Sequence, residues 1–287
     1  MADDLWTIQR LLLWTVPFFQ KHGLESPRLD AELLLSHVLK RARIYLYTDY
    51  EKMLSREELA AYKALIQKRI QGWSVASLIG EKEFMGLNFT VNDHVLIPRP
   101  DTEAWLEKVI QRCRGEGPLT VADLGTGSGA IIVSFLHYCP QAKGVAVDIS
   151  PEALEIAQKN GEMLGVSDRV EWREGDFLAP LKEGELFDII LTNPPYIPTA
   201  DMEGLAPEVK REPRLALDGG GDGLSFYRRF AEGGAAHVKP GGLAVLEVGE
   251  GEARDVTALL AASGEYESFD VIQDLGGIDR AVLARKK

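Results

Sequence analysis

From Leu119 onward, short apolar stretches alternate with stretches of helical periodicity, and this alternation constrains the fold more than any other feature of the chain. The predicted strands span 119–124, 144–148, 170–173, 187–193 and 243–248. Strands separated by helices form a parallel sheet that is covered on both faces. Two more segments, 268–273 and 280–284, flank Gly276-Gly277 and predict an antiparallel hairpin at the sheet edge. The predicted fold class is therefore α/β, with a doubly wound, Rossmann-like sheet.

The N-terminal part of the chain has a different pattern. From about Asp3 to residue 71, apolar residues recur at intervals of three and four, which predicts a small helical bundle. One helix should end near Gly23, and a second should begin at Ser26-Pro27. Another should begin at Ser55-Arg56-Glu57-Glu58, which has the spacing of a capping box.

Between these parts, residues 84–91 alternate like a strand, Asn92-Asp93 can form a turn, and residues 94–97 return as a second strand. Pro98 and Pro100 should end the resulting β-hairpin. The predicted organisation is an N-terminal helical domain over 1–75, a linker with the hairpin over 76–100, and a large α/β domain over 101–287.

The segment from Val121 to Ala130 is a strand that runs into a glycine-rich turn and then a helix. In an open α/β sheet such a turn lies at the carboxyl edge of the first strand, where nucleotides bind. Glycines let the backbone approach a ligand closely. Tight packing alone is the alternative explanation for a glycine turn of this kind.

Two acidic positions follow in register with this turn. Asp148 ends the next strand, where a carboxylate can accept hydrogen bonds from both ribose hydroxyls of an adenosine cofactor. After the strand that follows, Asp176 can meet the adenine amino group and Phe177 can cover the ring. The glycines of the turn have Gly-x-Gly-x-Gly spacing in place of Gly-x-Gly-x-x-Gly. The glycine turn, Asp148 and the Asp176-Phe177 pair together favour S-adenosylmethionine.

The most informative residues are Asn193-Pro194-Pro195-Tyr196, at the end of a predicted strand. The two prolines make the backbone rigid. If the side-chain oxygen of Asn193 and the carbonyl of Pro194 each accept one hydrogen of an NH2 group, its nitrogen is held facing a methyl donor, and Tyr196 can stack on the flat group. This predicts methylation of a planar amide or amine by orientation and matched dipoles, without a catalytic base. The alternative is a strand edge ended by prolines, with an aromatic plug.

Charge and composition weigh against several classes of protein. A formal net charge of -12 disfavours direct binding to DNA or RNA. The two cysteines and five histidines, His94 among them, show no ligand spacing, so neither a metal site nor a disulfide is predicted. An acidic N-terminus and the lack of a long apolar run predict a cytoplasmic protein without a membrane partner.

Taken together, these residues resemble the family of glutamine N5-methyltransferases that act on peptide chain release factors, known as PrmC or HemK proteins. The resemblance extends from the helical domain to the C-terminus. It is carried by Glu83 to Gly86, Ile97 to Glu103, Asp123 to Gly129, Asn193 to Tyr196, Glu212-Pro213 with Gly220 to Leu224, and Gly277 to Arg280.

The resemblance implies a class I methyltransferase fold, S-adenosyl-L-methionine as the cofactor, and class 1 release factors as protein partners. The implied substrate is the glutamine of their Gly-Gly-Gln motif, and the helical domain is the expected docking surface. The expected cofactor-binding residues are Gly125, Thr126, Gly127, Ser128, Gly129, Asp148, Asp176, Phe177 and Asn193. Asn193, Pro194, Pro195 and Tyr196 are expected to hold the glutamine amide, with Asn193, Pro194 and Tyr196 as catalytic residues.

The chain departs from the family pattern at three positions. Phe177 stands where a tryptophan is frequent, Ser77 where a tyrosine is common, and Glu252 where a glutamine often follows the Glu-Val-Gly turn. The first change keeps an aromatic ring for stacking on adenine. The other two bear on domain packing and leave the chemistry intact.

Several alternatives stay open from the sequence. An N6-adenine methyltransferase acting on nucleic acid could use the same four residues, but it would need a positive groove. A nicotinamide-dependent oxidoreductase would explain the glycine turn and Asp148, and a non-catalytic binding module would explain the fold alone. For Arg99 to Glu103, a helix start capped by Asp101 or Thr102 is nearly as good an explanation as contact with substrate.

Overall fold

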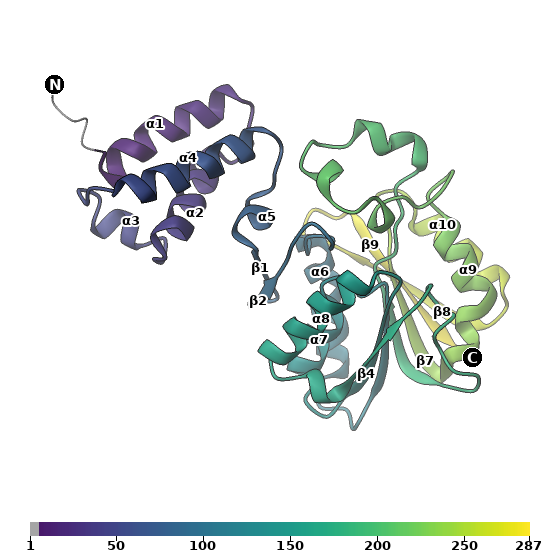
Figure 1. The fold of residues 1–287 in the computed structure, drawn as a ribbon. Helices are drawn as coiled ribbons and strands as arrows, with labels where there is room; N and C mark the ends of the chain where they lie inside the picture. Colours follow the sequence, from purple (N-terminus) through teal and green to yellow (C-terminus); the bar gives the residue numbers. More distant parts are fainter. Residues whose placement is uncertain (1–5) are drawn as a thin grey trace, which may run out of the picture. The chain divides into compact units, whose positions relative to one another are not determined.

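The computed structural model describes residues 6–287, so the predicted start of the helical region at Asp3 lies outside the described residues. The chain divides into two compact units (Figure 1). The first contains the chain up to Gly80 together with Ala206–Arg211. The second contains Glu81–Leu205 and Glu212–Lys287. Among residues 6–287, no helix is both long enough and apolar enough to cross a bilayer.

The first unit is helical, as predicted. Its elements are α1 (Ile8–Lys21), α2 (Pro27–Leu39), α3 (Tyr45–Thr48), α4 (Arg56–Ile70) and α5 (Val75–Ile79). The capping box at Ser55 and Glu58 is present in full. Pro27 begins α2, but the side chain of Ser26 makes no capping hydrogen bond. Phe19, Leu34 and Tyr62 are among the buried residues that form the core of this unit.

A short segment from much later in the chain, Ala206–Arg211, belongs to this helical unit. Within the unit, Arg69 forms an ion pair with Glu208 at 3.1 Å. The guanidinium of Arg211 donates to the carbonyl of Gln71 at 2.8 Å. These contacts hold the late segment against the end of α4.

The second unit begins with a hairpin whose register differs from the predicted one. Its strands are β1 (Glu81–Phe84) and β2 (Leu87–Thr90), and the turn is Met85-Gly86. Both turn residues have positive φ, +53° and +72°, and such turns match the twist of a two-residue hairpin. The chain does turn at Asn92-Asp93, where the Asn92 side chain accepts from the His94 N–H at 2.9 Å, but the predicted hairpin there is wrong, because residues 94–97 form no strand.

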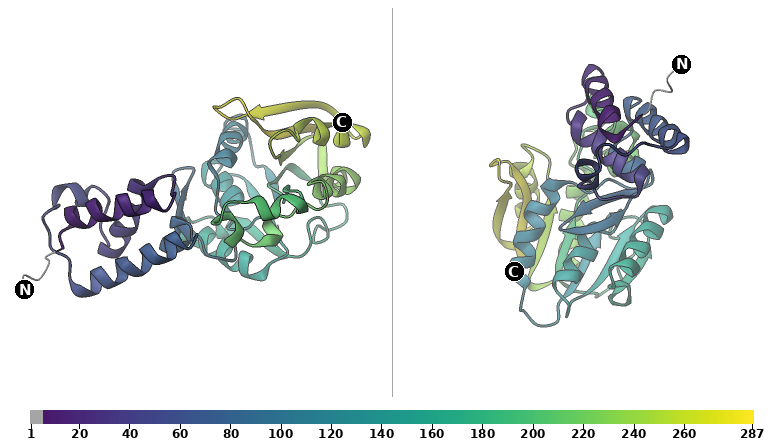
Figure 2. Two further views of the ribbon diagram at one scale, coloured as in Figure 1. Left: turned by 90° about the horizontal axis from the view of Figure 1, so that it is seen from above. Right: turned by 90° about the vertical axis from the view of Figure 1, so that its left-hand side faces the viewer.

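The main sheet has seven strands in the order β5-β4-β3-β6-β7-β9-β8. Figure 2 shows the C-terminal strands of this sheet, in yellow, at one of its edges. Their bounds are β3 Thr120–Leu124, β4 Lys143–Asp148, β5 Val170–Glu174, β6 Phe187–Thr192, β7 Val238–Glu247, β8 Tyr266–Gln273 and β9 Asp279–Lys286. β3 to β7 are parallel, and β9 and β8 pair antiparallel at one edge. The predicted parallel sheet and its edge hairpin are confirmed.

Helices cover both faces of the sheet (Figure 1). One face carries α6 (Pro100–Cys113), α7 (Ala130–Tyr138) and α8 (Pro151–Met163), and the other carries α9 (Ser225–Gly233) and α10 (Ala253–Ala262). Successive strand residues point to opposite faces. Accordingly, Val121 joins the core that contains Trp105 of α6, whereas Ala122 joins the core that contains Tyr227 of α9.

Short 3-10 helices occupy the connections, at Ser167–Arg169, Thr199–Gly204, Val209–Arg211, Arg214–Ala216 and Gly234–His237. Cys113 and Cys139 are buried free thiols.

Candidate active site

The register of the parallel strands brings the predicted site residues to one edge of the sheet. Leu124 at the end of β3 lies opposite Val147 of β4 and Thr192 of β6. The loops that follow these strands therefore begin side by side, at the carboxyl edge where open α/β sheets bind ligands. The glycine turn, Asp148 and Asn193 meet there although more than sixty positions separate the first from the last.

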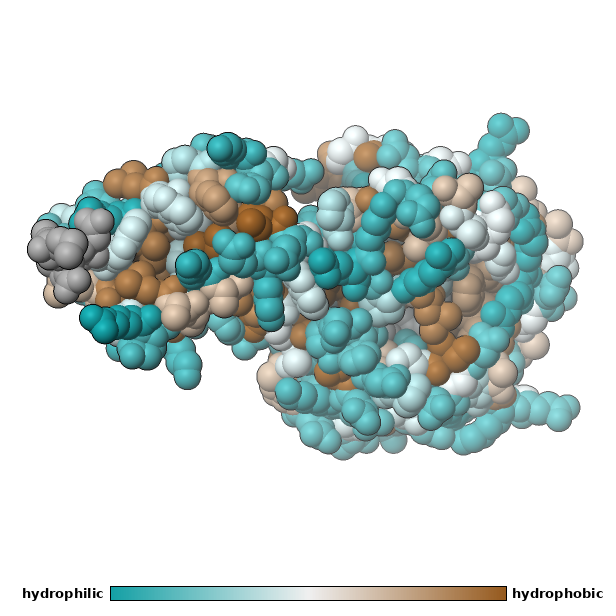
Figure 3. Space-filling view, turned by 45° about the horizontal axis from the view of Figure 1, so that its top comes forward, coloured by the Kyte–Doolittle hydropathy of each residue, from teal (hydrophilic) through white to brown (hydrophobic). Residues whose placement is uncertain are grey.

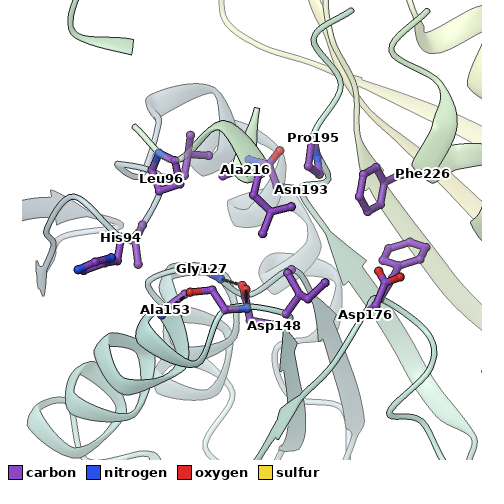
Figure 4. A pocket seen from close by; sticks show the side chains of 17 residues that line it. His94, Leu96, Gly127, Asp148, Ala153, Asp176, Asn193, Pro195, Ala216 and Phe226 are labelled. Atoms are coloured by element: carbon purple, nitrogen blue, oxygen red, sulfur yellow. Dashed lines mark hydrogen bonds between the residues drawn. The ribbon is translucent and has the colours of Figure 1, made fainter. Parts of the chain in front are cut away.

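A pocket opens at this edge, wholly within the second unit. Its lining residues include Gly125, Gly127, Asp148, Ile149, Ser150, Asp176, Phe177, Asn193, Pro195, Pro213, Leu215 and Phe226. Asn193 and Pro195 lie on the opposite side of the pocket from Gly127 and Asp148 (Figure 4). Asp176 and Phe226 lie toward one end, and His94 lies toward the other.

The three glycines of the turn have two different tasks. All three have positive φ, but a Cβ added to Gly125 or Gly127 would meet no atom within 4 Å. A Cβ on Gly129 would lie 3.1 Å from the Cβ of Ala157 in α8. Gly125 and Gly127 thus leave open space beside the pocket, while Gly129 permits close packing of two helices.

Asp148 is fixed by two backbone donors. Its Oδ2 accepts from the Gly127 N–H at 2.7 Å, and its Oδ1 accepts from the Ser150 N–H at 3.0 Å. Burial raises the pKa of this carboxyl above its usual range, against the lowering effect of these donors. Because a carboxylate has about four acceptor sites, both oxygens can still accept from the hydroxyls of a ligand.

Thr126 and Ser128 support the glycine turn from the protein interior and do not line the pocket. Both are buried, and the Thr126 hydroxyl donates to Oδ2 of Asp123 at 2.6 Å. Burial raises the pKa of Asp123 to about 7. These residues act on the shape of the glycine turn through the protein interior.

The end of the pocket predicted to hold adenine is aromatic and carries one ion pair. Phe177 is buried with φ of +56° and meets Phe226 edge to face at 5.4 Å. Arg229 lies over both rings and pairs with Asp176 at 2.9 Å. Phe226 and Arg229 come from α9, and no sequence signal marked them, because their spacing is that of any amphipathic helix.

The Asn193-Tyr196 segment is held by a second stretch of chain. The Ile197 N–H donates to the carbonyl of Leu217 at 3.0 Å, and the Gly219 N–H donates to the carbonyl of Ile197 at 2.8 Å. A Cβ on Gly219 would lie 2.7 Å from the Cα of Tyr196, so only glycine fits there. Burial raises the pKa of Tyr196. Asn193 and Pro195 line the pocket, with Pro194 buried between them and Tyr196 half-buried after them.

The segment from Ile97 to Glu103 is anchored by the later motifs of the chain. Glu212 accepts from the Ile97 N–H at 3.1 Å and pairs with Arg99 at 2.6 Å. Arg280 pairs with Asp101 at 3.1 Å. Three segments that carry the family resemblance are therefore joined by hydrogen bonds and ion pairs: Arg99 to Glu103, Glu212-Pro213, and Gly277 to Arg280.

The alternative in which Asp101 or Thr102 caps this helix is wrong. Arg99 occupies the N-cap position of α6 without a side-chain capping bond, and Pro100 begins the helix. The hydroxyl of Thr102 instead donates to Glu247 at 2.6 Å. Thr102 also accepts from Nδ2 of Asn193 at 3.3 Å. Glu247 and Thr102 are contacts of the site that sequence reasoning did not assign.

The positions that depart from the family pattern have local roles. The hydroxyl of Ser77 lies 2.8 Å from that of Ser74, which caps α5. Glu252 accepts from the Gly249 N–H at 2.9 Å and so closes the turn after β7. Among residues 6–287, no cluster of three or more potential ligand side chains could hold a metal ion.

Comparison with known proteins assigns the family. Residues 10–80 match the PrmC N-terminal domain, and residues 103–230 match the methyltransferase small domain. A release factor glutamine methyltransferase of Moorella thermoacetica is 45% identical over 265 residues, which cover 92% of this chain and 93% of the relative. The chain belongs to the release factor glutamine methyltransferase family. A second member, from Geobacter sulfurreducens, is 42% identical over 283 residues and is covered over 98% of both chains.

The solved structures agree on the fold of this family member. A methyltransferase of Pyrococcus furiosus superposes with a TM-score of 0.52 at 19% identity, over 71% of this chain and 91% of that one. The predicted family, the class I methyltransferase fold and S-adenosylmethionine as methyl donor are thereby confirmed. The pocket fits this cofactor, because it combines an open glycine turn, a carboxylate for ribose hydroxyls and an aromatic end.

Proposed function

We propose that this chain methylates the side-chain amide nitrogen (N5) of the glutamine in the Gly-Gly-Gln motif of class 1 peptide chain release factors. One observation supports the proposal most directly: Asn193 lines the same pocket as Gly127 and Asp148. Asn193, which we propose holds the planar NH2 group, thus lies across the pocket from Gly127 and Asp148, which we propose bind the cofactor. The relatives from Moorella thermoacetica and Geobacter sulfurreducens are both named release factor glutamine methyltransferase, and this chain matches them over nearly its full length.

Each site residue has a part in this reaction. When bound, S-adenosylmethionine would supply a sulfonium methyl group for transfer to the amide nitrogen, with the electron pair of the broken C–S bond left on sulfur. Asn193 Oδ1 and the Pro194 carbonyl accept the two hydrogens of the substrate NH2, which turns the delocalised lone pair toward the methyl carbon. Tyr196 covers the amide plane. The nitrogen afterwards releases one proton to water.

Cofactor binding is assigned to Gly125 through Gly129, Asp148, Asp176, Phe177 and Asn193. Gly125 and Gly127 leave room for the ligand, Asp148 receives the ribose hydroxyls, and Phe177 faces the adenine. Thr126, Ser128 and Gly129 keep the turn in shape from inside the protein. The enzyme needs mainly orientation, because the leaving sulfur is already neutral after transfer.

We further propose that residues 1–75 form the docking domain for the protein substrate, with 76–100 as linker and 101–287 as the transfer domain. Large apolar side chains are exposed on the helical unit, as brown areas at the left of Figure 3 indicate. They include Leu13, Trp14, Ile44 and Met53. A pocket within the unit is lined by Trp6, Trp14, Leu59 and Lys63. Such a surface suits a protein partner, and a translation factor as partner places the enzyme in the cytoplasm.

The test is transfer of a labelled methyl group from S-adenosylmethionine to a purified class 1 release factor, with the modified residue located by fragment mass spectrometry. Label on the glutamine of the Gly-Gly-Gln motif is the expected result. A factor in which that glutamine is replaced by asparagine serves as the matched control and should stay unlabelled. Label on DNA or RNA, with none on the factor, would overturn the substrate in favour of an adenine.

A further inference from the structure

A buried carboxylate lies behind the reacting segment. Glu247 is the last residue of β7, and only 2% of it is exposed. Its Oε2 accepts from the Thr102 hydroxyl at 2.6 Å and from the Trp105 indole N–H at 2.7 Å. A carboxylate is costly to bury unless donors satisfy it. A role in holding α6 against β7 would account for these two hydrogen bonds. It would not account for a third hydrogen bond in the group, which Thr102 makes to another residue.

That third contact connects the carboxylate to the site. Oγ1 of Thr102 lies 3.3 Å from Nδ2 of Asn193. Thr102 is itself 3% exposed, so no water competes for its hydroxyl from outside. A continuous chain of hydrogen bonds thus runs from Glu247 through Thr102 to Asn193, and all three residues belong to the second unit.

The chemistry of the groups fixes the direction of this chain. A threonine hydroxyl has one hydrogen, and here it is committed to Oε2 of Glu247. When the carboxyl is ionised, or carries its proton on the other oxygen, Oε2 accepts from both the Thr102 hydroxyl and the Trp105 N–H. Thr102 therefore offers Asn193 only lone pairs, and Asn193 must present its NH2 group to it.

The two ends of an asparagine amide are nearly equal in size, so packing alone does not choose between them. We propose that Thr102, oriented by Glu247, is a positioning residue that holds Nδ2 of Asn193 and so turns Oδ1 toward the substrate amide. The inference rests on the proposed function of Asn193. In the reversed orientation, the NH2 of Asn193 would face the NH2 of the substrate, with two donors opposed and no acceptor.

The same chain polarises the amide. Successive hydrogen bonds in a buried chain strengthen one another, and a donor bond from Nδ2 makes Oδ1 a better acceptor. Positive charge develops on the substrate nitrogen as its bond to the methyl carbon forms, and a stronger acceptor on its hydrogen stabilises that charge. The contribution of Thr102 should therefore be felt mainly in kcat.

The experiment compares Thr102→Val with Thr102→Ser. Valine keeps the branched shape and removes the hydroxyl, whereas serine keeps the hydroxyl. Thr257→Val is the matched control, because Thr257 is partly buried in α10, away from the pocket and the proposed docking domain, and its hydroxyl donates to the Ala253 carbonyl at 2.7 Å. For each variant, kcat and KM are measured with a purified class 1 release factor, Kd for S-adenosylmethionine by calorimetry, and the thermal midpoint by circular dichroism.

Thr102→Val is expected to lower kcat about 10- to 100-fold, the scale of a misplaced reacting group. KM and the cofactor Kd should stay near wild type, and Thr102→Ser should recover most of the rate. Thr257→Val should change the thermal midpoint and not kcat. A Thr102→Val enzyme with the wild-type kcat would overturn the inference, and so would a Thr102→Ser enzyme as slow as the valine variant.

A second measurement keeps the inference testable if Thr102→Val does not fold. In the wild-type protein, a nuclear Overhauser contact is expected between the side-chain NH2 of Asn193 and the methyl group of Thr102. Its absence would refute the proposed orientation. The Overhauser measurement also distinguishes failure of the two proposals. A wild-type enzyme that leaves the release factor unmethylated would refute the proposed function. The Overhauser contact would still decide the orientation of Asn193.

Discussion

Alanine substitutions at Gly127 and Gly129 should separate cofactor binding from stability, although the two glycines lie two residues apart. Their φ angles are +55° and +78°, and a non-glycine residue in that region costs about 1–2 kcal/mol at either position. At Gly129 the new Cβ would also lie 3.1 Å from the Cβ of Ala157 and 3.2 Å from its Cα. Such overpacking adds about 1–3 kcal/mol, so Gly129→Ala should destabilise the fold by roughly 2–5 kcal/mol in total.

Gly127→Ala should instead weaken the binding of the cofactor. No atom lies within 4 Å of the added Cβ, and Gly127 lines the pocket, so the new methyl group occupies space that the cofactor would use. If the cofactor must shift to avoid it, the cost of about 1–3 kcal/mol corresponds to roughly 5- to 150-fold weaker binding. The free energy of unfolding of the Gly127→Ala protein should fall only by the about 1–2 kcal/mol that a non-glycine residue costs at positive φ.

The assay pairs urea unfolding, followed by circular dichroism, with calorimetric titration of S-adenosylmethionine. Gly165→Ala is the control for the backbone cost alone, because Gly165 has φ of +70° and a Cβ there would meet no atom within 4 Å. A Gly127→Ala protein that binds the cofactor as well as wild type would refute the assignment of the turn. So would a Gly129→Ala protein no less stable than the Gly165→Ala control.

Three further variants test other parts of the site. Asn193→Ala should slow methyl transfer by about 10²- to 10³-fold and weaken cofactor binding far less, because the other assigned cofactor residues are kept; an unaltered rate would remove Asn193 from the mechanism. Burial raises the pKa of Glu247 from 4.5 to about 7, so its contribution to stability is complete below pH 4.5 and is lost as the pH rises through 7. The unfolding free energy of Glu247→Gln minus that of wild type should therefore grow by on the order of 3 kcal/mol across this range, and a flat difference in urea titrations would contradict burial as the cause. Glu212→Ala should cost about 1–3 kcal/mol by leaving the buried Ile97 N–H without its acceptor, and Glu212→Gln, which keeps an acceptor, should recover most of it in the same unfolding assay.

Strand positions followed closely from the sequence where apolar runs were bounded by turn residues. β3 through β6 begin and end within one residue of their predicted bounds. β8 begins two residues before its predicted start, and β9 ends two residues after its predicted end. β7 departs most, because it begins at Val238, five residues before the predicted start. Its first half, Lys239-Pro240-Gly241-Gly242, carries no apolar alternation, and its pairing with β6 is irregular there.

The hairpin shows how a local signal can mislead. Asn92-Asp93 has the composition of a turn, and Met85 does not, because a methionine rarely adopts positive φ. The hairpin nevertheless turns at Met85-Gly86, while the turn at Asn92-Asp93 joins no pair of strands. Phe84 and Phe89, on either side of Met85-Gly86, are fully buried in the core that contains Trp105. Tertiary burial of two aromatic rings decided the register against local preference.

The amino-acid sequence specifies the chemistry that is available at each strand end. The glycine turn, Asp148 and Asn193 follow apolar strands of a parallel sheet, and such strands deliver their carboxyl ends to one edge. The tertiary structure alone decided which distant side chains complete the site. Glu247 lies 145 positions from Thr102, and Thr102 lies 91 positions from Asn193, so no local pattern could relate them. Their hydrogen bonds exist because the packing of α6 against β7 brings the buried Thr102 and Glu247 together and places the Thr102 hydroxyl within reach of the partly buried Asn193.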